Sequence, residues 1–542
     1  MKVVPVPYKY PNPLVNNYLN NFSEVAHLFE HNPYGAGSFA DRYTEVIGDY
    51  RMDRHKLVQI LRTYNEKLQC GEKTRANIEK LQEPGTVAVV TGQQAGVFTG
   101  PLYTVYKAIT AIQLSEHISD QIGQDVIPVF WVAAEDHDFA EIDHVDLVNR
   151  EHEIIRLKLD YTPSGKYSIG QMPVTSAVTG LIEQLEAKTN ASEWKPDIVE
   201  KLRRLAGEAD NLADWFALTM AWLFDDFGLV MVNPMNPELR QLWGDTFADF
   251  LNKSELVTEK LGEGIKRVRN LGVEPQVEKE EHNVNLFLYV DGERLPLFKS
   301  GSVFTVRGRS ETWTLPELTQ IARETPELLS PNVVLRPVAQ DVLLPIMAYV
   351  AGPGEISYYA LYREIYPIFN QRMPIIYPRV NITLIERGTA KHMEIYRTNF
   401  ADGPSGINSK LEEWLKEQDQ IDIESLFSSY TSDLQTSFQE LIKKTAEISP
   451  ELTIHGSESL NKILHQISHF EQKALQYHRK SCDIGVKRFR QLENQLFPKG
   501  NLQERVFNIF PYLFKYGLGF MDNLIQLPLM EGHNHNLVYL GE

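Results

Sequence analysis

The stretch VAVVTGQQAGVFTGPLYTVYKAITAIQLSEHI, residues 87–118, decides the fold class of this chain. VAVVTG is a short apolar run that ends at a glycine, which is typical of a buried parallel strand. The segment that begins at Pro101 has apolar residues at helical spacing. A second apolar run, VIPVFWVAA at 126–134, follows it. Strand, glycine loop, helix and strand together predict a βαβ unit with a right-handed crossover.

Further apolar runs predict more strands of the same sheet. They lie at 229–234 (LVMVNP), 333–338 (VVLRPV), 346–355 (IMAYVAGPGE) and 373–380 (MPIIYPRV). Together they predict an open, mostly parallel α/β sheet whose strands are separated by insertions. VNLFLYVDGERLPLFK, residues 284–299, has the pattern of a hairpin in one of these insertions, with Asp291-Gly292 at the turn.

These changes of pattern set the expected domain boundaries. We expect N-terminal helices and the first half of the core in 1–150, a first insertion in 151–228, and the other core strands in 229–380, with a second insertion at about 236–330. Residues 381–500 are polar and helical, with two stretches of heptad spacing around SPELTIHGSE (449–458). They predict an antiparallel coiled-coil hairpin, with a plain helical bundle as the alternative. The aromatic tail, 501–542, is expected to return to the core.

Composition and charge narrow the classes of function. With 542 residues, the chain exceeds a single ordinary core, so we expect two or three domains or one with large insertions. A net charge of −18 argues against a nucleic-acid partner. Cys70 and Cys482 provide neither a disulfide framework nor a cysteine-rich zinc site. Without a signal peptide or a membrane-length apolar run, the protein is expected to be cytoplasmic, with no membrane partner.

The glycine loop after the first strand has the elements of an anion site. Gly92, Gly96 and Gly100 precede a helix start, where unpaired N–H groups and the helix dipole favour phosphate or carboxylate. The loop lacks both the lysine of a P-loop and the spacing of a dinucleotide-binding motif. A tight turn that needs glycine dihedrals is therefore the alternative.

Four adjacent ionisable residues follow the second strand, namely Glu135, Asp136, His137 and Asp138. They lie where an open α/β sheet places its ligand crevice, which favours acid–base or amine-binding roles. One alternative is a metal site formed by His137 with Glu141 and His144, and another is a solvated helix start. Of these, we do not predict the metal site.

A third loop, AGPGEISYY, offers Gly352, Gly354 and Glu355 at another helix start. Glu355 could accept hydrogen bonds from an ammonium group or simply favour the helix dipole. Upstream, VLRPVAQD contains Arg336, Gln340 and Asp341. The arginine could bind a carboxylate through two hydrogen bonds or form a structural salt bridge. No nucleophile stands out, because the chain has no G-x-S-x-G elbow and neither cysteine lies in these loops. The site is therefore expected to bind and position substrates.

Four stretches, read together, resemble the cysteine-adding enzymes of bacillithiol biosynthesis, and the resemblance covers essentially the full length. They are VVTGQQAGVFTGPLYTVYKA, PVFWVAAEDHDFAEI, VAGPGEISYYA and NLQERVFNIFPYLFKYG. The resemblance implies a Rossmann-like core related to class I nucleotidyltransferases and aminoacyl-tRNA synthetases. It also implies two connecting-peptide insertions and an α-helical coiled-coil domain used in homodimerisation. The implied reaction joins cysteine to the amine of glucosaminyl-malate. The signature HIGH of the wider group is replaced here by TGPLY (99–103), and KMSKS has only a faint echo in FKSGS (298–302).

Roles for individual residues follow from combining the resemblance with the loops. Amide formation requires an activated carboxylate, so ATP or ADP could bind. We expect catalysis by His137, Asp138 and Glu135, with His137 moving protons. Substrate contacts are expected from Gln93, Gln94, Thr99, Gly100, Tyr103, Asp136, Arg336, Gln340, Gly352, Gly354 and Glu355. Nucleotide contacts are expected from Gly92, Gly96, Arg505, Lys515, Tyr516 and Gly517.

Alternatives remain for the tail and for the function. The tail could be an aromatic latch that anchors residues 501–542 rather than part of a nucleotide site. The chain could also be a nucleotide-binding scaffold or sensor, or a nucleotidyltransferase acting on another small amino acid or sugar.

Overall fold

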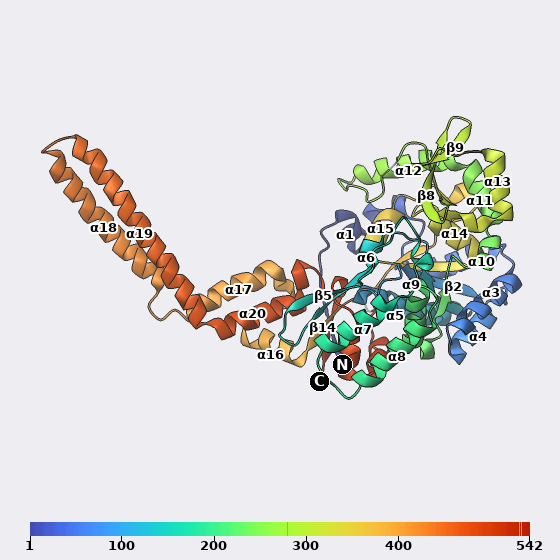
Figure 1. Ribbon diagram of the computed structural model, residues 1–542, viewed down its shortest axis with the longest axis horizontal. Coiled ribbons are helices and arrows are strands. Elements are labelled where there is room, and N and C mark those ends of the chain that lie inside the picture. Colours follow the sequence, from blue (N-terminus) through green and yellow to red (C-terminus); the bar gives the residue numbers. More distant parts are fainter. Residues whose placement is uncertain (279, 531, 533, 542) are drawn as a thin grey trace. The chain divides into compact units, whose positions relative to one another are not determined.

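A computed structural model describes residues 1–278, 280–530, 532 and 534–541 of the protein, which form two compact units (Figure 1). The first unit comprises Met1–Leu384 and Gln503–Val538. The second contains Ile385–Leu502 and a short C-terminal piece that starts at Tyr539. The tail expected at 501–542 includes Glu531, His533 and Glu542, which lie outside the described residues.

The first unit is built on a parallel sheet in the order β13-β12-β2-β3-β6. Its strands are β2 (Val87–Gln93), β3 (Val126–Val132), β6 (Val230–Val232), β12 (Ile346–Ala351) and β13 (Ile375–Pro378). The predicted α/β sheet is thus confirmed. The strand predicted at 333–338 is wrong, because helix α14 (Arg336–Leu343) begins within it.

Helices cover both faces of this sheet. Alternate residues of β2 separate into two cores, with Val87 and Val89 in one and Ala88 and Val90 in the other. The first core includes α2 (Ser38–Asp49) and α5 (Leu102–Ile122). The second and larger core includes α1 (Pro13–Asn20), α3 (Arg54–Lys67), α4 (Glu72–Lys80), α14 and α15 (Pro353–Tyr359). Because both faces are buried, the core strands read as continuous apolar runs.

Two insertions interrupt the sheet. Between β3 and β6 lie α6 (Phe139–Ile142), the antiparallel pair β4 (His144–Val148) and β5 (Ile154–Lys158), and α7 (Ser176–Lys188), α8 (Lys195–Glu208) and α9 (Leu212–Leu223). Between β6 and β12 lie α10 (Pro237–Gln241), α11 (Gly244–Asn252), α12 (Ser254–Arg269), α13 (Leu315–Glu324) and a sheet of β7 (Asn283–Val290), β8 (Glu293–Ser300), β9 (Val303–Val306), β10 (Thr312–Thr314) and β11 (Leu329–Pro331). The predicted β7–β8 hairpin turns at Asp291 and Gly292, both with positive φ.

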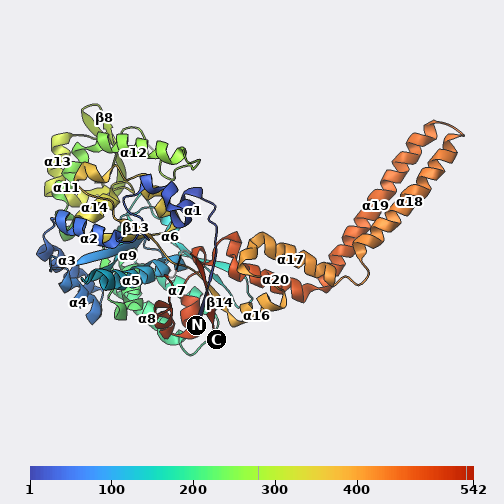
Figure 2. The ribbon, with the colours of Figure 1, turned by 180° about the vertical axis from the view of Figure 1, so that it is seen from behind.

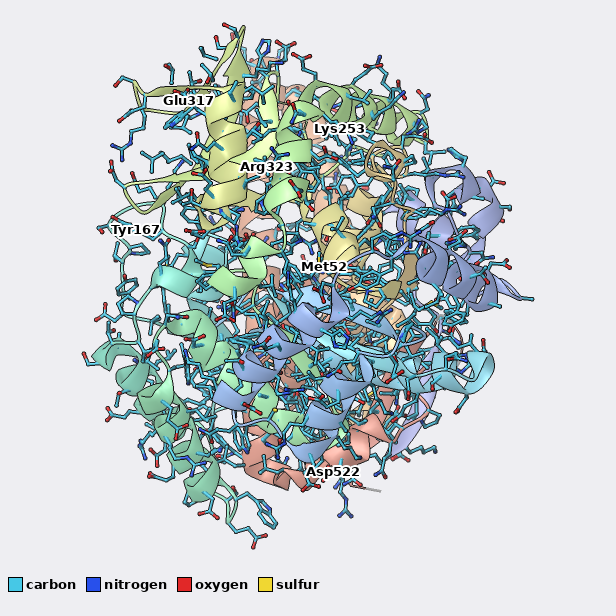
Figure 3. All side chains as sticks on the ribbon, turned by 90° about the vertical axis from the view of Figure 1, so that its right-hand side faces the viewer. Met52, Tyr167, Lys253, Glu317, Arg323 and Asp522 are labelled. Carbon is cyan, nitrogen blue, oxygen red and sulfur yellow. The ribbon has the colours of Figure 1, made fainter. Side chains whose placement is uncertain are left out.

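The tail joins the first unit through Asn508, which is fully buried. Its Nδ2 donates to Thr99 Oγ1 at 3.1 Å and to the Gly100 carbonyl at 2.7 Å. After it come α21 (Phe510–Tyr516), α22 (Gly519–Ile525) and β15 (His535–Leu540), which lies between β1 (Lys2–Val6) and β14 (Asn381–Glu386). Figure 3 shows Asp522 of α22 at the opposite end of the unit from Glu317 and Arg323 of α13.

The second unit is helical and contains α16 (Arg387–Ile395), α17 (Gly403–Glu417), α18 (Ile423–Ala446), α19 (Glu451–Ser481) and α20 (Asp483–Leu496). Helices α18 and α19 lie side by side as the predicted hairpin (Figures 1 and 2), with the Phe427 and Phe470 rings 5.3 Å apart. The chain reverses at 447–450, so most of the predicted connector belongs to α19. In the part of the chain that is described, no helix is both long and apolar enough to cross a membrane.

We predict that Asn508→Ala destabilises the first unit by about 1–3 kcal/mol, because it removes the shorter of the two hydrogen bonds to the buried Gly100 carbonyl and leaves only the 3.3 Å bond from Thr99 Oγ1. Thermal unfolding monitored by circular dichroism should show a lower midpoint for the transition of this unit. Asn20→Ala, which changes an exposed helical residue, serves as the control. An unchanged midpoint in the Asn508 variant would show that the tail is held by other contacts.

Candidate active site

A cleft of about 570 Å³ opens at the carboxyl ends of β2 and β12. These neighbouring strands lie at the centre of the sheet order, where one connection runs outward to β3 and the other to β13. An open α/β sheet places its ligand crevice at this switch point. The cleft is lined by Gly92, Gln93, Gln94, Tyr103, Lys107, Trp131, Ala133, Glu135, Asp136, His137, Phe287, Arg294, Pro331, Asn332, Val333, Arg336, Tyr349, Gly352, Pro353, Gly354, Glu355, Tyr358, Arg379 and Arg505. The three loops singled out from the sequence therefore meet.

The glycine loop forms a closed turn at the base of α5. The N–H group of Gly100 donates to Val97 O at 3.0 Å, and that of Leu102 donates to Phe507 O at 2.8 Å. A side chain at Gly96 would place its Cβ 3.1 Å from the Gly100 Cα, so the turn requires close backbone approach. Thr99, Gly96 and Gly100 do not line the cleft. This geometry favours the tight-turn alternative over an open phosphate cradle.

Lys107 is the principal cleft residue that sequence reasoning missed. It lies on α5, and its Nζ donates to the Gly92 carbonyl at 2.9 Å and to Gln93 Oε1 at 3.0 Å. Its third partner is Glu355 Oε2, at 2.5 Å. The sequence did contain a sign of this role, because Lys107 is a charged residue among the apolar residues of TVYKAITAI. The helix that carries it packs on β2 and β3.

Glu355 caps α15 and closes the opposite wall. Its Oε2 accepts from the Gly352 N–H at 2.7 Å, and its Oε1 accepts from Tyr349 at 2.7 Å and from Tyr358 at 3.4 Å. Burial alone would raise the pKa of Glu355, but Lys107 and the hydrogen bonds from Gly352 and Tyr349 lower it below its usual value. The carboxylate is therefore ionised and already surrounded by donors.

Asp136 organises the acidic segment after β3. Its Oδ1 accepts from the N–H groups of His137 at 2.7 Å and Asp138 at 3.2 Å, and its Oδ2 accepts from Gln94 Nε2 at 2.8 Å. Burial acts to raise the pKa of Asp136, yet these hydrogen bonds and the charge of Arg294 lower it. Its donors are neutral, and among the described residues its one ion-pair contact is the His137 ring at 4.0 Å, which carries charge only when protonated.

His137 faces Arg294, a second residue that the sequence analysis missed. Arg294 Nη1 donates to His137 Nδ1 at 3.3 Å, and Arg294 is held by Ser330 Oγ at 3.0 Å and the Pro331 carbonyl at 3.0 Å. Burial, followed by the charge of Arg294, lowers the pKa of His137. The hydrogen bond assigns the proton of the neutral ring to Nε2. His137 is therefore arranged as a hydrogen-bond donor rather than as a base.

The two other predicted catalytic residues differ in position. Glu135 is buried and forms an ion pair with Arg240 of α10. Asp138 is exposed and does not line the cleft. Their catalytic roles stay predictions, and the pairing of Glu135 makes it an anchor between β3 and the second insertion.

Arginines supply most of the positive charge of the cleft. Arg336 donates to Gln340 Oε1 at 3.1 Å and to Tyr358 Oη at 2.9 Å. Gln340 itself is buried behind Arg336 and does not line the cleft. Arg379 donates to Glu504 Oε1 at 2.6 Å, and Arg505 of the tail lies exposed at the rim. Arg379 was not among the site residues expected from the sequence.

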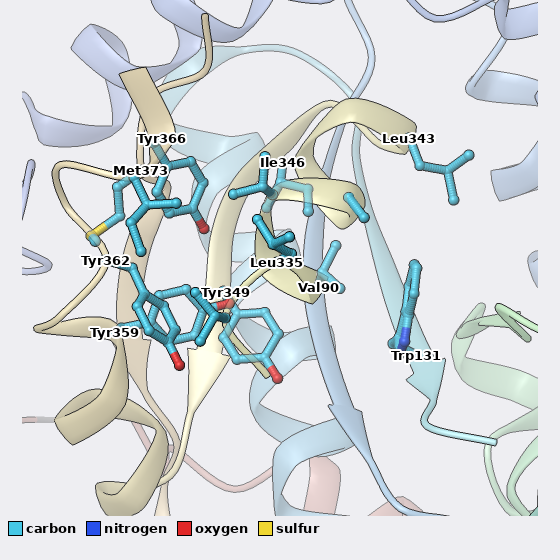
Figure 4. Packing of buried hydrophobic residues seen from close by; sticks show 14 of the residues in the cluster. Val90, Trp131, Leu335, Leu343, Ile346, Tyr349, Tyr359, Tyr362, Tyr366 and Met373 are labelled. Carbon is cyan, nitrogen blue, oxygen red and sulfur yellow. The ribbon is translucent and has the colours of Figure 1, made fainter. Parts of the chain in front are cut away.

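Aromatic rings line part of the cleft and the core behind it. The rings of Tyr349 and Tyr359 are tilted against each other with their centroids 5.1 Å apart, and Figure 4 shows both beside Tyr362. Trp131 lines the cleft and is buried, and its Nε1 has no hydrogen-bond partner among the described residues. A buried donor beside a cleft is available to an acceptor on a ligand.

The structure separates the residues expected to bind nucleotide. Gly92 and Arg505 line the cleft, whereas Lys515, Tyr516 and Gly517 lie at the end of α21. A Cβ at Gly517 would lie 2.9 Å from the ring of Trp194, and the Tyr516 ring stacks on Phe520. This end of α21 resembles the aromatic latch that was the alternative.

The FKSGS motif and the possible metal site do not add residues to the cleft. In FKSGS, Lys299 pairs with Glu255 at 2.6 Å, on the second insertion. Within the described ranges, no group of three or more His, Cys, Asp or Glu residues is arranged to hold a metal ion.

Comparison with known proteins agrees with this architecture over the whole chain. Residues 1–380 match the family described as "Bacillithiol biosynthesis BshC, N-terminal Rossmann-like domain", and residues 382–540 match "Bacillithiol biosynthesis BshC, C-terminal coiled-coil domain". A protein of Desulforamulus reducens named "Putative cysteine ligase BshC" is 36% identical over 540 residues, or 99% of this chain and 100% of the relative.

Relatives with the same printed name come from other bacteria. The protein of Symbiobacterium thermophilum is 37% identical and covers 98% of both chains, and that of a Geobacillus species is 30% identical and covers 100% of both. The Rossmann-like fold class and the family resemblance are both confirmed. This chain belongs to the BshC family of bacillithiol biosynthesis.

Proposed function

We propose that this protein is a cytoplasmic ligase that joins L-cysteine to the amine of glucosaminyl-malate and so forms bacillithiol. The names of its relatives support cysteine ligation. The observation that carries the proposal is the charge of the cleft. In the described residues that line it, five cationic side chains (Lys107, Arg294, Arg336, Arg379 and Arg505) face three carboxylates (Glu135, Asp136 and Glu355).

The charge that remains after internal pairing suits an anionic substrate. Lys107 is paired with Glu355, and Arg379 with Glu504. Within the described part of the chain, Arg294 and Arg336 donate only to neutral groups or to the His137 ring. Guanidinium groups that face a cleft without a carboxylate partner favour binding of carboxylate or phosphate. The malyl group of glucosaminyl-malate is a dicarboxylate of this kind.

Asp136 fits the amine of a substrate better than the other cleft carboxylates. Glu135 is engaged by Arg240 and Glu355 by Lys107, so each already has a cationic partner. Asp136 has only neutral hydrogen-bond donors and a lowered pKa, and is therefore ionised at neutral pH. An ammonium group beside it would complete the pairing.

Amide formation also needs an activated carboxylate, which ATP would supply. The N-terminus of α5 does not fit a phosphate group, since the Leu102 N–H already donates to Phe507 O. Arg505 fits it better, because it lines the cleft with a guanidinium group suited to phosphate oxygens. This side chain would hold the negative charge while Asp136 holds the amine.

The exposed face of the helical hairpin supports a homodimer. Phe470 and Tyr477, seven residues apart on α19, are 65% and 70% exposed, and Tyr430 and Leu441 on α18 are also exposed. Residues seven apart lie on one face of a helix, at the spacing of a coiled-coil seam. A second copy of the chain would cover these side chains.

We expect the purified protein, given cysteine, glucosaminyl-malate and ATP, to form bacillithiol, detected by mass spectrometry after thiol labelling. A deletion strain should lose bacillithiol and accumulate glucosaminyl-malate. Normal bacillithiol in that strain would contradict the proposal. Such a result would leave the nucleotide-binding scaffold and the other nucleotidyltransferase as candidates.

Substitution of His137 by Gln or Asn tests which of its two ring nitrogens takes part in the reaction, because the two amide groups overlap different nitrogens of the ring. Gln at this position can place an N–H near the Nε2 of the imidazole, whereas Asn can replace only the Nδ1 acceptor. If His137 donates through Nε2, we expect His137→Gln to lose about tenfold in kcat or less, the value of a single hydrogen bond, and His137→Asn to lose more. Equal losses of at least about 100-fold in both would instead indicate proton transfer.

The dimer is tested by placing charge on the exposed stripe. The double variant Phe470→Glu/Tyr477→Glu should be monomeric by light scattering coupled to size exclusion. Burial of the new carboxylates between paired helices would cost desolvation free energy that no partner charge offsets. Gln472→Glu adds charge on the same helix, away from the stripe, and should remain dimeric. A wild-type monomer, or a dimer that survives the double change, would contradict this interface.

A further inference from the structure

Lys107 is fully occupied by protein groups. It is almost completely buried, and its ammonium has three donors, which match the three acceptors on Gly92, Gln93 and Glu355. No donor is left for a ligand. The lysine nevertheless lines the cleft, so its influence on a substrate must pass through the groups that it holds.

Glu355 is occupied to the same degree. An ionised carboxylate offers about four acceptor positions, and Glu355 receives Lys107 and the Gly352 N–H at Oε2 and Tyr349 and Tyr358 at Oε1. A substrate ammonium would have to displace one of these donors. The substrate-binding role expected for Glu355 from the sequence is thus better described as an indirect one.

Two groups that face the cleft depend on this pair. Lys107 holds the Oε1 of Gln93, which leaves the amide nitrogen to donate to Gln94 Oε1 at 3.2 Å and to Tyr103 Oη at 3.4 Å. Glu355 accepts from Tyr358, whose hydroxyl in turn accepts from Arg336 Nη2 at 2.9 Å. Both Gln93 and Arg336 line the cleft. The pair therefore connects β2 and α5 with α14 and α15 on opposite sides of the switch point.

We propose that Lys107 and Glu355 are positioning residues, which fix Gln93 in the wall of the cleft and, through Tyr358, hold Arg336 in the orientation that binds the anionic substrate. The inference rests on the proposed function for the identity of that substrate. It predicts that loss of the pair weakens substrate binding more than the chemical step, since neither residue touches the reacting atoms.

Ionisation of Glu355 provides a readout that a merely structural role would not produce. The groups that face it are Lys107 and Tyr103 on α5, Arg336 on α14, Tyr349 on β12 and Tyr358 on α15, and the charge of Arg379 after β13 acts on Lys107. Without Lys107, burial raises the pKa of Glu355, so its carboxyl is protonated over a wider pH range. Raising the pH restores the carboxylate and with it the acceptor for Tyr358.

The experiment compares Lys107→Met, Glu355→Gln and Tyr358→Phe with the wild type in the ligase assay. We expect each to raise KM for glucosaminyl-malate by about tenfold or more, and to change kcat by less than about threefold, as for a lost charge-assisted hydrogen bond. In Lys107→Met alone, KM should fall again as the pH rises, and Lys107→Met/Glu355→Gln should lack this pH dependence. Lys80→Met removes a lysine from an exposed ion pair with Asp125 and should change neither constant.

Direct binding separates failure of this inference from failure of the proposed function. L-malate should raise the melting temperature of the wild type and raise it less in all three variants, whether or not bacillithiol forms. No malate-dependent shift in the wild type would overturn the inference, as would an unchanged KM or a pH-independent loss in Lys107→Met. If Lys107→Met does not fold, Tyr358→Phe still decides, because it keeps the ring and removes only the hydroxyl link.

Discussion

The ion pair between Lys107 and Glu355 is the contact on which the cleft depends. It joins the first helix of the βαβ unit to the helix after β12, across the point where the sheet reverses its winding. A charge buried in this way is costly unless it is paired and hydrogen-bonded. Both members meet that condition completely, so the walls of the cleft cannot separate without exposing two unsatisfied charges.

Other buried pairs extend the same constraint around the cleft. Glu135 after β3 is tied to Arg240 in the second insertion, and Arg379 after β13 is tied to Glu504 in the tail. Each pair anchors a strand end to a segment that is distant in the sequence. Among the described residues Arg294 and Arg336 have no carboxylate partner, so they mark where an anionic ligand would neutralise charge. The same set of ion pairs therefore anchors the strand ends and determines which cationic groups are left for an anionic ligand.

Sequence reasoning could predict the sheet and the meeting of its loops, because parallel strands place their carboxyl ends at one edge. It could not predict the partners of the buried charges. Lys107 lies among apolar helical residues, and Arg294 reaches the cleft on a hairpin of the second insertion about 160 residues beyond His137. The strand expected at VVLRPV failed for a related reason, since Val334, Leu335 and Val338 are apolar because they are buried at a helix start. A short apolar run indicates that a segment is buried, but it does not distinguish a strand from a helix.

The state of the titratable groups favours binding and positioning over proton transfer. Asp136 has a lowered pKa, so it stabilises an ammonium but is a poor base for removing its proton. The lowered pKa of His137 leaves the ring neutral, with Nδ1 engaged by Arg294 and the proton on Nε2. A neutral donor and fixed guanidinium groups suit oxygen atoms that gain negative charge as a carbonyl is attacked. An ammonium held by Asp136 would have to lose a proton to solvent before its nitrogen could attack, which requires a cleft that is open on one side, as the exposed position of Arg505 at its rim allows.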